Sequence, residues 1–457
     1  MEYGYKKGLL DGNITKNLLK MSLPTMLGFL FQSAYDLVDM MWIGKISSTA
    51  VAGVTIFATI FWLVDVLNSI IGTSSVSLIS QYYGKNDMEK TSRVIEQTLT
   101  FKGLVAIIAG GIILILLRPL LEFFTKDQEV IKSALSYGYI RIFFLPIMFS
   151  SFTVNTAFRC IGDAKKPMMI MVIAAVLNVI LDPIFIFEKV PYVNIPGLNL
   201  GVFGAALATV LSTMVAFGVG IYIFISGKTK VKIQVKNLLK LDKEMDKKLI
   251  TIGLPSGFEI LSRNLAAIMT LKFVTIYGTV AIATMGIGNK LFNFTFLPLL
   301  GLNMGASAIV GQCLGAEKID RAKATAIRAV MVGVGCMSLV ILISILFPQR
   351  IMDAFTDDQA VIETGILMIR VVAPSLIGVA VAMGLGCVFS GSGYNIPFLV
   401  SSLVARWGIQ VPMLAIVTYR MHLPIIWVWS TYVLADVGEM IVLFIGYKRG
   451  KWEKKRV

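Results

Sequence analysis

The sequence predicts an all-α polytopic membrane protein of twelve transmembrane helices, arranged as two six-helix bundles that repeat one another. Three observations lead to this fold class: an apolar composition, long apolar blocks between short polar intervals, and an internal repeat. Of the 457 residues, 56% are hydrophobic and only 15% are charged, whereas soluble domains carry about 25% charged residues. This composition excludes a soluble protein with a large core.

The apolar blocks are long enough to cross a bilayer, since each spanning helix needs about 20 apolar residues. The first block runs through Trp42, which is too long for a signal peptide, and no small-residue cleavage site accompanies it. The predicted spans are 18–43, 50–80, 95–117, 134–158, 167–187, 201–226, 250–277, 281–310, 325–347, 361–388, 397–418 and 424–447.

The chain repeats itself after 231 residues. The stretch FFTKDQEVI at 123–131 returns as AFTDDQAVI at 354–362. Further matches at the same offset pair Pro24 with Pro255, Gln81 with Gln312, Gly84 with Gly315, and Gly162 with Gly393. Each half holds six spans, an even number, so both halves begin on the same side of the membrane. This indicates a parallel repeat, with the two halves related by an axis along the membrane normal.

The longest polar interval separates the two halves. We therefore expect an N-terminal bundle over 1–226, a basic linker over 227–248, and a C-terminal bundle with a basic tail over 249–457. Most of the 42 Lys and Arg residues lie on the side of the N-terminus, the linker and the C-terminus. This asymmetry predicts that both termini are cytoplasmic, in a multi-pass protein of a prokaryotic-type cell membrane.

The same asymmetry explains the formal charge of +15 without a nucleic-acid partner. Polybasic ends suit anionic membrane lipid instead. Four cysteines without CxxC spacing support neither a disulfide framework nor a zinc site. The single histidine, His422, falls in an outer loop, and the chain has no HExxH or GxGD motif. We expect no cofactor and no enzymatic activity.

Carboxylates inside the predicted spans are the strongest functional signal, because a charge in the membrane is costly and usually functional. Span one contains Asp36 and Asp39, and span two contains Asp65. Span five contains Asn178 and Asp182, which are four residues apart and so share a helix face. Pro183 follows directly and should free backbone carbonyls there.

Neutral oxygens could complete a cation site beside these carboxylates; the candidates are Tyr35, Tyr139, Asn155 and Thr209. A sodium ion needs such oxygen ligands, whereas a proton needs a carboxylate that burial makes readier to accept it. These residues do not distinguish a sodium ion from a proton as the bound ion. An alternative is that Asp39 and Asp182 only tie spans one and five together, although neutral Ser, Thr or Asn would do so at lower cost.

The second half has a different set of polar residues. Glu259 and Arg263 lie four apart on span seven and could simply satisfy one another. Lys290 is a further candidate for lining a cavity. Asp436 and Glu439 in span twelve need partners, for which Arg406 is the candidate. Pro24 and Pro255 should kink spans one and seven, which makes each a candidate hinge or a packing feature.

Several motifs together resemble the multidrug and toxic compound extrusion (MATE) family. They are a first span reading LPTMLGFLFQSAYDLVDMMWIG, a QxxG loop after span two, LNVILDP in span five, and the twofold six-span repeat. The resemblance extends from about Leu18 to Gly446. It implies a monomeric, V-shaped pair of six-helix bundles that exports small organic compounds, often cationic or amphipathic, by antiport with sodium ions or protons.

By position, the family's first-half cation site falls on Asp39, Asn178, Asp182 and Thr209, which would hold the Na⁺ or the proton. Its neighbours would be Tyr35, Tyr139 and Asn155. Independently of the resemblance, the polar residues Asp36, Glu259 and Lys290 are further candidates for the surroundings of this site or the substrate cavity. The segment 371–393 in span ten lacks the acid of the NorM-like branch. The chain therefore resembles the DinF-like or archaeal-type branch, coupled through its first half.

A second reading is a flippase for a lipid or a lipid-linked saccharide, from the related larger superfamily. A basic cavity would favour it, and the candidate residues are Arg141, Arg263, Lys290, Arg370 and Arg406. Those families often add spans beyond twelve, and none is predicted here. An intramembrane enzyme is the third class, which the motif content disfavours.

Overall fold

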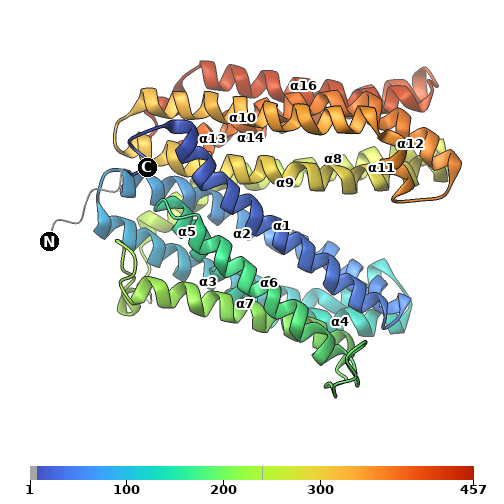
Figure 1. Ribbon diagram of the computed structural model, residues 1–457, viewed down its shortest axis with the longest axis horizontal. Helices are drawn as coiled ribbons and strands as arrows, with labels where there is room; N and C mark the ends of the chain where they lie inside the picture. The colour runs from blue at the N-terminus through green and yellow to red at the C-terminus, as the bar shows by residue number, and fades with distance from the viewer. Residues whose placement is uncertain (1–7, 239) are drawn as a thin grey trace. The chain divides into compact units, whose positions relative to one another are not determined.

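The computed structural model describes residues 8–238 and 240–457, and this part of the chain is almost entirely helical (Figure 1). The first half contains α1 (Ile14–Gly44), α2 (Ser48–Gly84), α3 (Met88–Phe124), α4 (Gln128–Phe143), α5 (Leu145–Cys160), α6 (Lys165–Ile186), α7 (Gly201–Ile225) and the short turn η1 (Val235–Asn237).

The second half contains α8 (Lys243–Val274), η2 (Thr275–Tyr277), α9 (Thr279–Gly315), α10 (Ile319–Leu346), α11 (Pro348–Asp353), α12 (Gln359–Val372), η3 (Ala373–Ser375), α13 (Leu376–Ser392), α14 (Ile396–Ser402), η4 (Leu403–Gln410), α15 (Val411–Ala415), η5 (Ile416–Arg420), α16 (Ile425–Lys448) and α17 (Lys451–Lys454). Two of the short segments, η4 and η5, are π-helical, so the span from α14 to η5 is locally underwound.

The predicted all-α membrane class is confirmed, and each of the twelve predicted spans falls on a helical segment. Within the described residues, ten helices are long and apolar enough to cross a membrane. The pair α4 and α5, which meet at an angle of 57°, adds an eleventh. The remaining long helix is α1, whose apolar run is interrupted by polar residues such as Gln32 and Asp36. Those polar residues matter for the site described below.

The chain forms two compact units whose boundaries differ from the predicted ones at both ends of the first half, since the predicted linker 227–248 also belongs to the first unit. One unit is Leu27–Thr251, and the other combines Ile252–Val457 with the segment up to Met26. The start of α1 therefore packs with the second half of the chain: a Cβ built on Gly305 of α9 would lie 2.7 Å from the Ser22 Oγ. The division falls inside α1, two residues after Pro24.

The unit of Leu27–Thr251 is held together by an apolar core between α2, α3, α4 and α7. Phe57 of α2 lies at its centre and makes an edge-to-face contact with Tyr137 of α4, with ring centroids 5.6 Å apart. Gly138 allows this approach, since a Cβ there would lie 2.7 Å from the Phe57 ring. The core thus holds α4 close to α2, with Tyr137 facing inward.

Helices α6 and α7 pack closely because Gly204 has no side chain. A Cβ at this position would lie 2.5 Å from the Phe185 carbonyl oxygen, which cannot move without shifting the backbone of α6. We expect Gly204→Ala to lower the free energy of unfolding by about 1–3 kcal/mol. Thermal unfolding of the purified protein measures this. Gly218→Ala is the matched control on α7, since nothing lies within 4 Å of its Cβ. Equal midpoints for the two variants would contradict the prediction.

The second unit is built around α9, α10, α13 and α16. Two glycines of α13 permit close helix packing: a Cβ on Gly384 would lie 2.8 Å from the Val330 Cα of α10, and one on Gly391 would lie 2.7 Å from the Ser307 carbonyl oxygen of α9. A separate apolar cluster surrounds the fully buried Trp429 of α16. This unit is therefore as tightly packed as the first.

The repeated loops have the same hydrogen bonds, which explains why the sequence repeats there. Asp127 caps α4 by accepting from the backbone N–H groups of residues 129 and 130, at 2.9 and 3.3 Å. Asp358 caps α12 in the same way, at 2.9 and 3.4 Å from residues 360 and 361. Aspartate is among the preferred residues at a helix N-terminus, because its oxygen satisfies N–H groups that have no partner in the helix.

Two other matches in the repeat mark special backbone conformations. Gly162 and Gly393 have positive φ angles of 88° and 77°, which glycine adopts without the steric penalty of a Cβ. Asn86 and Glu317, which are also 231 residues apart, have φ angles of 62° and 60° after the ends of α2 and α9. The two halves therefore share backbone turns as well as sequence.

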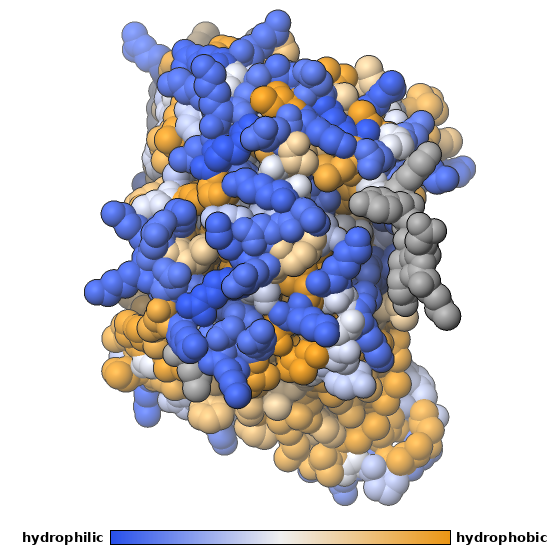
Figure 2. Space-filling model, turned by 90° about the vertical axis from the view of Figure 1, so that its left-hand side faces the viewer, coloured by the Kyte–Doolittle hydropathy of each residue, from blue (hydrophilic) through white to orange (hydrophobic). Residues whose placement is uncertain are grey.

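The basic linker runs along α3 within the first unit. The Gln234 N–H donates to Glu96 at 2.6 Å, and Ser92 and Thr100 donate to the Lys232 and Leu238 carbonyls. The Gln97 amide donates to Asp246 at 2.7 Å. Figure 2 shows one face of the molecule on which hydrophilic side chains gather. Large apolar side chains are exposed along the helices, as a surface in contact with lipid requires.

Candidate functional site

The four residues predicted to form the cation site lie on α1, α6 and α7 of the first unit. Asn178 donates to Asp182 at 3.1 Å and lies 3.4 Å from the Thr209 hydroxyl. Thr209 in turn donates to the Ala205 carbonyl at 3.1 Å. Asp39 of α1 is buried as well, and it interacts electrostatically with Asp182. The sequence spacing that put Asn178 and Asp182 on one helix face thus produces a direct contact.

This cluster has more acceptor oxygens than donors. In this cluster, Asp39 Oδ1, Asn178 Oδ1 and Asp182 Oδ2 are buried and have no hydrogen-bond partner among the residues that the structure describes. Buried polar atoms in proteins almost always have a partner, so three unsatisfied oxygens in one cluster need an explanation. A bound cation or a proton supplies the missing interaction. The donor set consists of carboxylate, amide and hydroxyl oxygens, which fits a hard cation as well as a proton.

Pro183 adds to the surplus of acceptors. It lies inside α6 directly after Asp182 and has no N–H to donate to the carbonyl of residue 179, one turn earlier. A proline at this point therefore weakens the helix beside the carboxylate.

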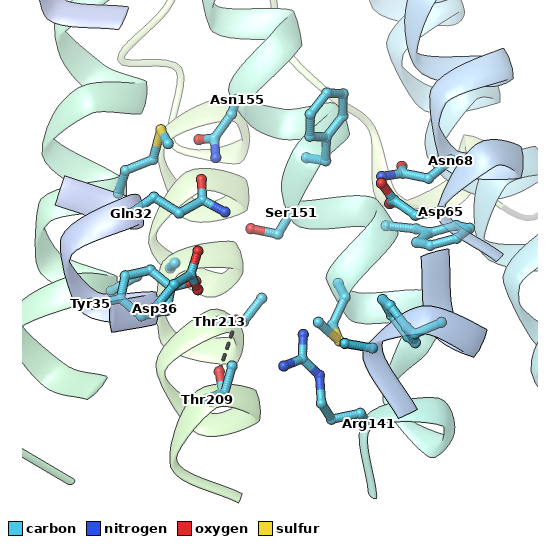
Figure 3. Close-up of a pocket in the computed structure, with 18 of the residues that line it drawn as sticks. Gln32, Tyr35, Asp36, Asp65, Asn68, Arg141, Ser151, Asn155, Thr209 and Thr213 are labelled. Carbon is cyan, nitrogen blue, oxygen red and sulfur yellow. Dashed lines mark hydrogen bonds between the residues drawn. The ribbon is translucent and has the colours of Figure 1, made fainter. Parts of the chain in front are cut away.

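A cavity of about 530 Å³ opens within the same unit. Figure 3 shows polar side chains entering it from different sides, with Tyr35 and Asp36 on one side and Asp65 with Asn68 on the other. Thr209 belongs to both the cavity wall and the cation cluster, and its carbonyl accepts from Thr213 at 2.8 Å. The cavity therefore adjoins the buried carboxylates.

Several first-half candidates line this cavity, whereas Asp39, Asn178 and Asp182 lie in the adjoining cluster and Tyr139 lies in neither. Tyr35, Asp36 and Asn155 are in its wall. Tyr139 is 44% exposed on the outside of α4, whereas Tyr137 is 3% exposed and lines the cavity. Residues two apart on a helix point in nearly opposite directions. The prediction for Tyr139 is therefore wrong, and Tyr137, which the sequence analysis did not single out, takes its place because of how α4 packs.

Arg141 is a cavity residue that sequence reasoning weighed only for the flippase. It lies one turn after Tyr137 and donates to the Tyr137 hydroxyl at 2.8 Å. Arg141 interacts electrostatically with both Asp36 and Asp39. The carboxylates are singled out because a charge in the membrane is costly. The same argument holds for this arginine.

Lys102 is a second unforeseen charge. It is fully buried in α3, and its Nζ has no hydrogen-bond partner among the described residues. The nearest aromatic face belongs to Phe152, 4.7 Å from Nζ. Asp65, which accepts from Asn68 at 2.9 Å, interacts with Lys102 at longer range.

Glu259, Asp436 and Glu439 of the second unit are paired with arginines. Glu439 pairs with Arg263 at 2.8 Å and with Arg406 at 3.3 Å. Arg406 also pairs with Asp436 at 3.1 Å, which confirms the partner expected for that residue. Arg263 pairs with Glu259 at 2.8 Å, which confirms the mutual satisfaction of these two residues. The network contrasts with the unpaired oxygens of the first unit.

A cavity of about 300 Å³ lies beside this network. Arg263, Arg406 and Asp436 contribute to its wall. Neither Glu259 nor Lys290 lines it, and Lys290 is exposed. The second-half candidates are therefore not brought together. Pro24 and Pro255 lie inside α1 and α8, close to the divisions between the two compact units.

The fold and the site define a class: a multi-pass α-helical membrane protein of two like halves, with a polar cavity and buried carboxylates in the first. The sequence model of the MatE family matches residues 24–184 and 255–416, which together make up more than half of the chain. The chain belongs to this family. The two matched segments begin 231 residues apart, at the offset of the internal repeat.

Curated relatives match along nearly the whole chain. The probable multidrug resistance protein YoeA of Bacillus subtilis is 28% identical over 95% of this chain and 93% of its own. The multidrug export protein MepA of Staphylococcus aureus is 27% identical over 95% and 94%. A crystal structure of MATE in the straight conformation shares the fold, with a TM-score of 0.88 at 24% identity over 96% of this chain and 97% of that one.

Proposed function

We propose that the protein exports small organic compounds across the cell membrane by antiport with sodium ions or protons. The observation that carries the proposal is the surplus of buried, unpaired oxygens on Asp39, Asn178 and Asp182 beside a polar cavity. Relatives named as multidrug resistance and multidrug export proteins support the substrate class. The chemistry is binding and release, and no covalent step is required.

In this mechanism the coupling ion binds to the Asp39, Asn178, Asp182 and Thr209 cluster and removes its unsatisfied acceptors. Ion binding and substrate binding then compete, because Thr209 belongs to both the cluster and the cavity wall. Ion entry from outside favours release of the substrate to the exterior. An ion drives such a change only through its different affinity for the two conformations.

The change between the two conformations needs a flexible element. We assign this role to the helix segments around Pro24 and Pro255. Pro24 lies two residues before the division between the compact units, and Pro255 lies three residues after the other division. A proline weakens the helix at this point because it removes a backbone hydrogen bond. The basic linker and the basic tail would face the cytoplasm.

The test uses liposomes that contain the purified protein and the ethyl ester of rhodamine B, a cationic dye. Dye efflux is followed under an imposed sodium gradient and, separately, under an imposed proton gradient. We expect one of the two gradients to drive efflux, which also identifies the coupling ion. Efflux that neither gradient changes would overturn the proposal.

A flippase for lipids or lipid-linked saccharides is the second candidate, and one observation favours it. Arg141 and Arg159 line the first cavity, and neither takes part in an ion pair among the described residues. Such groups would suit a phosphate. Fluorescent lipid analogues in the same liposomes discriminate the two functions, since a flippase would scramble them and leave the dye in place.

A further inference from the structure

The charged side chains around the first cavity are separated rather than paired. They are Asp36, Asp65, Arg141 and Arg159, and no ion pair within the described residues involves any of them. The second cavity differs, because both of its arginines are held by carboxylates. A cavity with unpaired charges of both signs is suited to a ligand that also carries both signs.

Arg141 is the basic group with the clearest free donor. Its Nη1 donates to the Tyr137 hydroxyl, while its Nε is buried and has no hydrogen-bond partner among the described residues. The guanidinium carbon lies 5.3 Å from the Phe61 ring centroid and 5.4 Å from that of Tyr137. These rings stabilise the positive charge. They do not satisfy the N–H groups, which in a buried site normally have an acceptor.

Arg141 points into the cavity in Figure 3, and Asp36 enters from another side on α1. A guanidinium binds a carboxylate or a phosphate through two parallel hydrogen bonds, which gives both strength and geometry. We propose that the first cavity binds zwitterionic organic compounds, with the anionic group of the substrate on Arg141 and its cationic group on Asp36. This inference rests on the proposed function and names the substrate class of the same cavity.

A simpler role for Arg141 is that of a counter-charge for the nearby acids. It does interact electrostatically with Asp36 and Asp39. Within the described residues neither carboxylate forms an ion pair with it, and Arg141 lines the cavity with an Nε that has no hydrogen-bond partner. A pure counter-charge would influence all ligands through the acids, whereas an anion-binding group discriminates between ligands that differ only in an anionic group.

The experiment exploits that difference with two dyes that share one fluorophore. Rhodamine B carries a carboxylate and is zwitterionic, whereas its ethyl ester lacks the anion and is a cation. Binding of each dye to the protein in lipid nanodiscs is measured by fluorescence anisotropy. We expect the wild-type protein to bind rhodamine B more tightly than the ester. Arg141→Gln should weaken rhodamine B binding by about tenfold or more and leave the ester unchanged or tighter.

Two further variants keep the result interpretable. Arg141→Lys retains the charge but not the planar donor pair, so it should keep part of the preference for rhodamine B and shows that the position tolerates substitution. Arg118→Gln, at an exposed ion pair with Glu122, is the matched control and should bind both dyes as the wild type does.

Three outcomes separate the two proposals. Equal binding of both dyes to the wild type, or equal weakening of both by Arg141→Gln, would overturn the zwitterion site. If the ester is still exported under an ion gradient, the exporter function survives that result. Absence of both dye binding and dye export would reject the exporter and the zwitterion site together.

Discussion

Asp182→Asn is expected to abolish ion-driven efflux. The substitution keeps the size of the side chain and its contact with Asn178 but removes the charge that would bind the coupling ion. Interactions of a charged group are worth about 1.5–3 kcal/mol, so ion affinity should fall by about 10- to 100-fold. Asp39→Asn should have the same effect, because its Oδ1 is one of the three unsatisfied oxygens.

The measurement is dye efflux from liposomes under the gradient that drives the wild type. Glu122→Gln is the matched control, since this carboxylate belongs to the same unit but lies in an exposed pair with Arg118. Thermal unfolding is recorded for all variants, which separates loss of coupling from loss of fold. Full efflux by both Asn variants would show that the carboxylates are only structural hydrogen-bonding groups.

Arg406→Gln is expected to have the largest effect on stability. Arg406 is the partner of both Asp436 and Glu439, at 3.1 and 3.3 Å, and these side chains are only 8% and 14% exposed. Removing one member of a buried ion pair leaves an uncompensated charge and costs about 3–5 kcal/mol. The free energy of unfolding should fall by about that amount. Arg328→Gln is the control, because Arg328 lies exposed on α10 of the same unit.

A double variant distinguishes the ion pair from simple packing. Removing both charges, in Arg406→Gln with Asp436→Asn, should restore part of the lost stability, since no charge is then left without its partner at this pair. Glu439 keeps its contact with Arg263 in that variant. If the stability losses of the two single variants simply add in the double variant, the pair is not coupled and the prediction fails.

The repeat could be predicted from sequence in unusual detail because its matches are local. An aspartate at a helix N-terminus and a glycine at positive φ are required by the backbone within a few residues. The loops at Asp127 and Asp358 and the turns at Gly162 and Gly393 therefore have the same conformations in both halves. The family match at residues 24–184 and 255–416 follows the same offset.

Long-range contacts could not be predicted in the same way. The attachment of the start of α1 to the second unit depends on the close packing of Ser22 against Gly305, which are far apart in sequence. The choice of Tyr137 over Tyr139 depends on how α4 is rotated against Phe57. The attachment of α1 and the rotation of α4 both depend on which helix surfaces fit together. The helical periodicity of the sequence does not determine this fit.

The sequence by itself determined the membrane class, the twelve spans, the repeat and the carboxylates of the first half, because hydrophobicity, turn chemistry and the cost of buried charge are properties of short segments. The sequence also predicted the Glu259–Arg263 pair and Arg406 as the partner of Asp436, but only the tertiary structure decided which charges are left unpaired. Within the part of the chain that the structure describes, arginines neutralise Glu259, Asp436 and Glu439, whereas Asp39, Asn178 and Asp182 keep unsatisfied oxygens and Arg141 keeps a free donor. Pairs between helices, such as Arg406 with Asp436, require side chains from different helices to meet within about 4 Å, and packing alone determines that.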